Sequence, residues 1–291
     1  MIAGQETPGA FPERSMKRWL ATFAMFAACS AALRADVTIV QTTTIDGGMP
    51  AMSGQAMSPT TTTRIKGLKS RSDIDSEMIK LSGIADLETK QVIVLSPGQK
   101  TAQILTASSV GGAIKDSASG VTPPVVNWSI KPTGKSQVID GFTCDEYTFS
   151  TTLNMSEISP GGSMPPEAAE MMKSVSMTMN GSMWVAKDVP GAADYVAFQK
   201  AAAASDLASL VYGAAGIPMP GVDRMLKAIG SVGGVPYLIE MTMSIQGAGQ
   251  MAEMMQQAGP TKVTSRVKAI STDPISDDVF KIPQGYTVVK Q

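Results

Sequence analysis

The residues that most often carry out catalysis are missing or isolated in this 291-residue sequence. It has no histidine, which excludes a Ser-His-Asp or Cys-His arrangement and the usual histidine-containing zinc sites. Carboxylates that could act as acid and base occur at Asp73 and Asp75, Asp145 and Glu146, and Asp277 and Asp278. Adjacent residues of a strand, such as Asp145 and Glu146, point to opposite faces, and nothing in the sequence suggests that any of these pairs shares a cleft, which favours solvated charge. We therefore expect no catalytic residue, no cofactor and no enzyme activity.

Methionine is the unusual residue of this chain. There are 21, and three of them (Met1, Met16 and Met25) precede residue 36, so 18 lie in the remainder. A thioether is a soft ligand for Cu(I), and the candidates for such a site are Met177, Met179, Met183, Met241 and Met243. Alternatively, these methionines fill the inner face of a sheet, because the side chain is unbranched and adapts to apolar neighbours. We favour the second interpretation and assign no metal site.

The strand patterns position these methionines on one face. In Val175–Asn180, Val175, Met177 and Met179 alternate with polar residues. The alternation is longer in Tyr237–Gln246, where one face carries Tyr237, Ile239, Met241, Met243 and Ile245. A third such strand is Val263–Ile270. One apolar and one polar face predict an antiparallel sheet with one side in water.

Other strands and turns complete a mainly β chain. Ser96-Pro97-Gly98-Gln99 predicts the turn of a hairpin between Gln91–Leu95 and Thr101–Leu105. Further strands are expected at Val37–Ile45, Thr61–Lys69, Val125–Ile130, Gln137–Ile139 and Thr143–Thr151. Helical spacing predicts insertions near 165–174, 192–230 and 249–259, with a helix break near Ser205. The regions Gly47–Pro59 and Ser156–Pro166 are predicted to be loops.

The N-terminus has the pattern of a secretory signal. From Met16 a charged start is followed by an apolar stretch and small residues, so residues 1–35 are predicted to be a signal peptide with a spurious leader at 1–15. The apolar core Trp19–Cys29 is too short for the ~20 residues that span a bilayer. Cleavage is expected after Ala32 or Ala35, and lipid attachment at Cys29 is the alternative. Residues 36–291 then form a single exported domain without a transmembrane segment.

Charge and cysteine content narrow the function further. Beyond residue 35 there are 20 basic and 23 acidic residues, a net charge of −3. This mild acidity gives no electrostatic case for binding nucleic acid or an anionic membrane. Cys144 is the one cysteine of this part, so it has no disulfide partner within the chain. We expect it to be buried.

Four stretches resemble a family of exported bacterial proteins, the domain of unknown function 4412. They are Asp86–Lys100, Gly134–Tyr147, Met183–Pro190 and Val279–Tyr286. That family is similar in fold to LolA, the periplasmic lipoprotein carrier, and to lipid-binding relatives such as LppX. The resemblance implies a curved antiparallel sheet that forms an incomplete barrel, an α+β fold with short helices over the concave face. It also implies a periplasmic location in a Gram-negative bacterium.

Periodicity and resemblance together favour a soft apolar cavity. The predicted lining residues are Met177, Met179, Trp184, Ile239, Met241 and Met243. We therefore expect a non-enzymatic protein that binds or carries a lipid, a lipoprotein or another apolar ligand. The alternative is an envelope-associated interaction module with a filled core and no ligand. The sequence leaves open the ligand, the partner and the oligomeric state.

Overall fold

The chain divides into two units, Met1–Arg34 and Ala35–Gln291. The computed structural model describes residues 36–47, 58–77, 80–106, 128–154, 174–205, 222–247, 253, 256–257 and 259–290. The predicted signal peptide, its leader, Cys29 and most of the insertions near 165–174 and 249–259 lie outside these described residues. Neither helix of the described part is long and apolar enough to cross a membrane.

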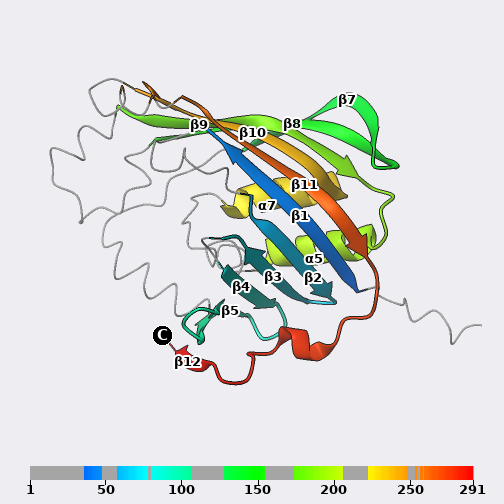
Figure 1. The fold of residues 1–291 in the computed structure, drawn as a ribbon. Coiled ribbons are helices and arrows are strands. Elements are labelled where there is room, and N and C mark those ends of the chain that lie inside the picture. The colour runs from blue at the N-terminus through cyan, green and yellow to red at the C-terminus, as the bar shows by residue number, and fades with distance from the viewer. Residues whose placement is uncertain are drawn as a thin grey trace, which may run out of the picture. The chain divides into compact units, whose positions relative to one another are not determined.

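In the described residues of the second unit, 12 strands form one open, curved sheet (Figure 1). Its strands are β1 Val37–Asp46, β2 Thr60–Lys66, β3 Lys69–Asp75, β4 Lys80–Asp86, β5 Gln91–Ser96, β6 Thr101–Thr106, β7 Ser129–Ile139, β8 Phe142–Asn154, β9 Ser176–Ala186, β10 Val235–Gln246, β11 Thr261–Ser271 and β12 Thr287–Lys290. Their spatial order is β12-β6-β5-β4-β3-β2-β1-β11-β10-β9-β8-β7. The predicted mainly β class is confirmed.

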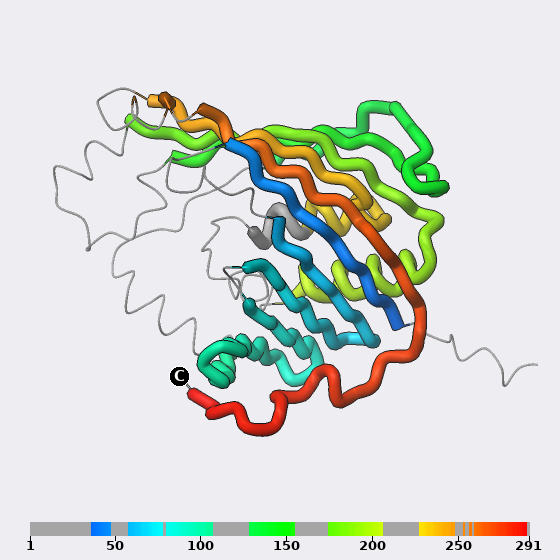
Figure 2. The backbone as a smooth tube through the Cα atoms, viewed as in Figure 1, coloured from blue at the N-terminus to red at the C-terminus, as the bar shows by residue number. Residues whose placement is uncertain are grey.

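The sheet is mixed, which corrects the purely antiparallel prediction. Every neighbouring pair is antiparallel except β12, which runs parallel to β6. The N-terminal β1 lies beside the late β11, so distant parts of the sequence meet in the middle of the sheet (Figure 2). The two ends of the strand order, β7 and β12, are not paired with each other, so the sheet is not a closed barrel.

Two helices, α5 Ala192–Ala204 and α7 Val222–Val232, pack against each other and on the sheet (Figure 1). Phe198 and Ala202 of α5 are buried in the same core cluster as Val37 and Ile39 of β1. The helix ends at Ser205, whose hydroxyl donates a hydrogen bond to the Ala202 carbonyl (2.7 Å). This is the predicted break.

The predicted strand boundaries were wrong in two regions of the sheet. The expected strand Thr61–Lys69 is two strands, β2 and β3, joined by a turn at Gly67, which adopts φ 58°. Such a positive φ suits glycine and reverses the chain. Conversely, the separate strands expected at Val125–Ile130 and Gln137–Ile139 are parts of one strand, β7, which continues through Pro132. An edge strand tolerates a proline, and the pairing of β7 with β8 shifts register there. Residues 125–127 lie outside the described part.

The C-terminal segment packs over one end of the sheet. The 3-10 helix η1, Asp277–Phe280, places Phe280 in a buried cluster with Ile84, Leu95 and Ala102. Lys66 donates a hydrogen bond to the Ile275 carbonyl (2.7 Å), which ties this segment to β2. This segment and β12 were absent from the sequence predictions.

Candidate functional site

Five of the six predicted lining residues lie on one face of β9 and β10. The strand register pairs Met179 with Met243 and Met177 with Ile245, while Met241 is opposite Gly181. Side chains of directly paired residues share a face of the sheet. We call the shared apolar surface the methionine face, and its residues are Met177, Met179, Met183, Ile239, Met241 and Met243.

The methionine face is densely packed in its centre and more open around it. Met179 and Met183 are each 2% exposed. Met179 packs with Leu153, and partly buried Met177, Met241 and Met243 surround this pair. Met183 packs with Phe149 and Val185, and Val232 of α7 covers that cluster. The methionine face therefore combines a buried core at Met179 and Met183 with partly exposed methionines that can adapt their conformation.

Two buried polar atoms adjoin this face without a hydrogen-bond partner in the described part of the chain. They are Trp128 Nε1 and Thr151 Oγ1. Thr151 is opposite Met179 in the β8–β9 register, and Trp128 packs against the Met179 cluster. A buried polar atom left unpaired costs about 1–3 kcal/mol. A ligand that brings a hydrogen-bonding group to this place would remove that cost.

Trp184 is not brought together with the other predicted lining residues. It is paired with Leu238 of β10 and Glu146 of β8, one position out of phase with Met183. Its side chain therefore points to the opposite face of the sheet. It is partly buried against the cluster that contains Cys144, Ala186 and Tyr237.

Sequence reasoning missed Gly181, Trp128 and Thr151. A Cβ on Gly181 would meet the Glu240 carbonyl oxygen, Met241 Cα and the Phe149 ring. Gly181 therefore lets the strands and the Phe149 ring approach closely on the methionine face. An isolated glycine inside an alternating strand is a known signal of such an approach. No comparable signal marks Trp128 or Thr151.

The carboxylates considered for acid–base chemistry have structural partners. Asp145 and Glu146 pair with Lys187 (2.8 Å) and Lys135 (3.4 Å). Three other carboxylates considered above also form ion pairs: Asp277 with Lys66 (2.9 Å), Asp278 with Lys281 (2.7 Å) and Asp75 with Lys80 (3.2 Å). Across the described ranges, His, Cys, Asp and Glu form no group of three or more that could hold a metal ion. Cu(I) binding by thioethers stays the minor alternative to core packing, since this search covers no methionine.

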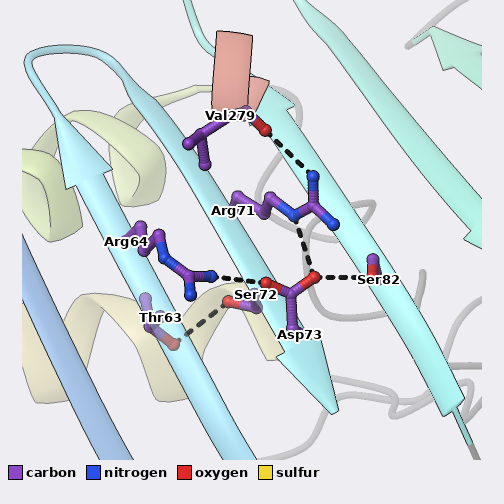
Figure 3. A network of polar contacts seen from close by, with 7 residues as sticks. All are labelled: Thr63, Arg64, Arg71, Ser72, Asp73, Ser82 and Val279. Carbon is purple, nitrogen blue, oxygen red and sulfur yellow. Dashed lines mark hydrogen bonds and ion pairs between the residues drawn. The ribbon is translucent and has the colours of Figure 1, made fainter. Parts of the chain in front are cut away.

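The most connected polar group is Asp73 on β3 (Figure 3). Its carboxylate accepts hydrogen bonds from Arg64 (2.6 Å), Arg71 (2.8 Å) and Ser82 (2.6 Å). Arg71 also donates to the Val279 carbonyl (3.1 Å), so the network joins the sheet to η1. Burial opposes ionisation of Asp73, but the hydrogen bonds from Ser82 and Arg71 and the nearby arginine charges lower its pKa overall. The network joins β2, β3, β4 and η1, and so it stabilises the fold.

We expect Asp73→Asn to remove part of the acid sensitivity of the fold. A carboxyl group whose pKa is lowered by folding stabilises the protein above its unfolded pKa, about 4, and this stabilisation is lost as pH falls through the folded pKa. At pH 7 the variant should lose about 2 kcal/mol of unfolding free energy through weakened charge-assisted bonds. Urea unfolding at pH 7 and pH 3 measures both effects. A variant with the wild-type difference between the two pH values contradicts this assignment.

The prediction that Cys144 is buried is confirmed. Its side chain is 0% exposed, and Sγ lies 3.6 Å from the Phe142 carbonyl oxygen. Burial raises the pKa of the thiol, which keeps it protonated and unreactive. Cys144 is thus a core residue.

No protein-family model matches the sequence, and no curated protein matches it. Among solved structures, an uncharacterised conserved protein of Thermus thermophilus is 6% identical, with a TM-score of 0.37 over 93% of this chain and 99% of that chain. A DUF1329 family protein of Desulfovibrio piger is 10% identical, with a TM-score of 0.28 over 91% of this chain and 96% of that chain. Likenesses at this level do not indicate what this chain binds.

Proposed function

We propose that this protein is a non-enzymatic, extracytoplasmic binder or carrier of an amphiphilic ligand, such as a lipid or the lipid-modified part of a protein. The apolar portion of the ligand lies on the methionine face. Its hydrogen-bonding group lies against Trp128 Nε1 and Thr151 Oγ1. The observation that carries the proposal is this pair of buried polar atoms, which have no hydrogen-bond partner among the described residues, beside an otherwise apolar cluster. Buried polar atoms in folded proteins normally have partners.

The packing of the face supports a deformable ligand rather than a rigid one. Met177, Met241 and Met243 are partly buried, and each methionine has three rotatable bonds with which to adapt. Val232 places α7 beside the same surface. We propose that the helices cover the concave side of an incomplete barrel of the LolA type, as the resemblance to domain of unknown function 4412 implies.

The proposal includes the location of the protein. The signal-like segment within residues 1–35 directs the chain out of the cytoplasm, to the periplasm of a Gram-negative bacterium. Cleavage after Ala32 or Ala35 yields a diffusing carrier. Lipid attachment at Cys29 yields a tethered one.

A second candidate function is an interaction module with a filled core. The near-complete burial of Met179 and Met183 favours it, because the centre of the methionine face is already occupied by side chains. In this case the partly buried residues around the centre, Met177, Met241 and Met243, are ordinary protein surface. The two candidates differ in whether the native protein contains a ligand.

We expect the native protein, purified gently from its own envelope fraction, to carry a lipid. Native mass spectrometry should show an adduct that disappears after extraction with organic solvent. The same extraction should make the protein competent to bind a fluorescent fatty acid. A native mass equal to that of the polypeptide, together with no probe binding before or after extraction, supports the filled-core candidate and contradicts the carrier.

A further inference from the structure

The opposite face of the same strands carries a pocket. It is an open basin of about 720 Å³ across β7 to β11, within the range of about 300–1,000 Å³ that is typical of small-ligand sites. Most of its side chains alternate with those of the methionine face, so they point away from it. We call this surface the polar basin. It is independent of the proposed function.

Two rows of register partners build the polar basin. The first row crosses five strands through Lys131, Thr148, Ser182, Glu240 and Thr264. The second row lies beside it, one pleat away along the strands, and crosses through Ser129, Ser150, Asn180, Thr242 and Lys262. Between them, the two rows carry several hydroxyl groups and one amide. Lys131 lies at the β7 end of the first row, and Lys262 lies at the β11 end of the second.

The charged groups of the basin differ from those just outside it. Glu146, two residues before Thr148, pairs with Lys135 (3.4 Å), and Arg266, two residues after Thr264, pairs with Asp140 (2.7 Å). Within the described ranges, no ion pair or side-chain hydrogen bond engages Lys131, Glu240 or Lys262, although Asp46 is opposite Lys262 in the register. The basin thus holds charges that are available to a ligand.

We propose that the polar basin binds a soluble acidic saccharide, with its anionic group on Lys131 or Lys262 and its hydroxyls on the rows between them. The inventory of donors and acceptors supports this class. Serine and threonine hydroxyls and the Asn180 amide both donate and accept, as sugar hydroxyls do, whereas lysine only donates. The three charged residues sum to one positive charge, which complements a phosphate or carboxylate. The two rows themselves are polar, while Phe149, Met241 and Val263 also line the basin.

The test is calorimetric titration in a phosphate-free buffer, with glucose 6-phosphate as the probe and glucose and inorganic phosphate as its two halves. We expect glucose 6-phosphate to bind at least roughly 10-fold more tightly than either half, because both kinds of contact contribute. A Lys131→Ala, Lys262→Ala double variant should lose roughly 10-fold or more of that affinity. The matched control is Lys187→Ala, an exposed lysine outside the basin, which should bind as wild type.

Three results overturn the proposal: no binding of glucose 6-phosphate, binding no tighter than that of phosphate, or equal losses in the double variant and the control. Circular dichroism establishes that each variant is folded. Both lysines of the basin are exposed, so their removal should not disturb the core.

Discussion

Replacing Gly181 by alanine should lower the free energy of unfolding by about 3 kcal/mol, at the upper end of what overpacking a well-packed core costs. The added Cβ would overlap the Glu240 carbonyl oxygen and lie 2.9 Å from both Met241 Cα and the Phe149 ring. Two of these neighbours are backbone atoms of β10, so relief requires the β9–β10 pairing to shift. Urea unfolding followed by circular dichroism measures the loss.

Gly83→Ala is the matched control for this substitution. Gly83 is also inside a strand, β4, but a Cβ there has no neighbour within 4 Å. Its replacement should be neutral or slightly stabilising, because alanine restricts the unfolded chain. If the two variants are equally stable, the close approach at Gly181 does not hold the strands together in this way.

Truncating Met183 should also cost about 3 kcal/mol of unfolding free energy, since Met→Ala changes in cores cost about 2–5 kcal/mol. The side chain is 2% exposed and lies between Tyr147 of β8 and Ile239 of β10 in the register. Its loss leaves a cavity beneath Val232 and Phe149. The same unfolding experiment measures the effect.

Met183→Leu serves as the control, because a swap that nearly conserves volume usually costs less than about 1.5 kcal/mol. A clear gap between the two variants is expected. Equal stability of Met183→Ala and Met183→Leu would mean that this part of the methionine face is not a packed core.

The alternating strands were predictable because their pattern is local. In β10, Ile239, Met241 and Met243 alternate with the polar residues Glu240, Thr242 and Ser244, and this pattern can be read within one short segment. The β5–β6 hairpin was equally visible, since its turn is encoded by Pro97 and Gly98. These elements need no knowledge of distant residues.

Three features were not predicted correctly from the sequence. Trp184 was expected to line the cavity, yet strand alternation sends its side chain to the face opposite that of Met183. The parallel pairing of β12 with β6 joins residues that are far apart in the chain. That Thr151 Oγ1 has no partner among the residues that the structure describes depends on its surroundings in three dimensions, which strand periodicity does not report.

The polar basin could not be predicted from the sequence for a similar reason. Thr148, Ser182 and Thr242 have the composition of any solvent-facing strand, and threonine favours strands on its own account. Only the register aligns them into rows, and these rows line one open pocket. Among the described residues, Glu146 and Arg266 outside the basin are held in ion pairs with Lys135 and Asp140, unlike the charged residues within it.

The most direct test of the central claim is Thr151→Val, measured both for stability without ligand and for displacement of a bound fluorescent fatty acid. Thr151 is 4% exposed, and its hydroxyl adjoins the methionine face without a partner in the described part of the chain. Valine has a similar shape and removes only that polar atom, so the ligand-free protein should gain about 1 kcal/mol. If the ligand uses the hydroxyl, affinity for the probe should fall about five-fold.

The neighbouring Thr152→Val is the control, because Thr152 is exposed on the opposite face and bonds Thr178 (3.5 Å). It should leave probe binding unchanged. Thr151→Val is thus expected to stabilise the protein and to weaken probe binding. A Thr151→Val variant that is no more stable than wild type and binds the probe as tightly would contradict the proposed binding mode.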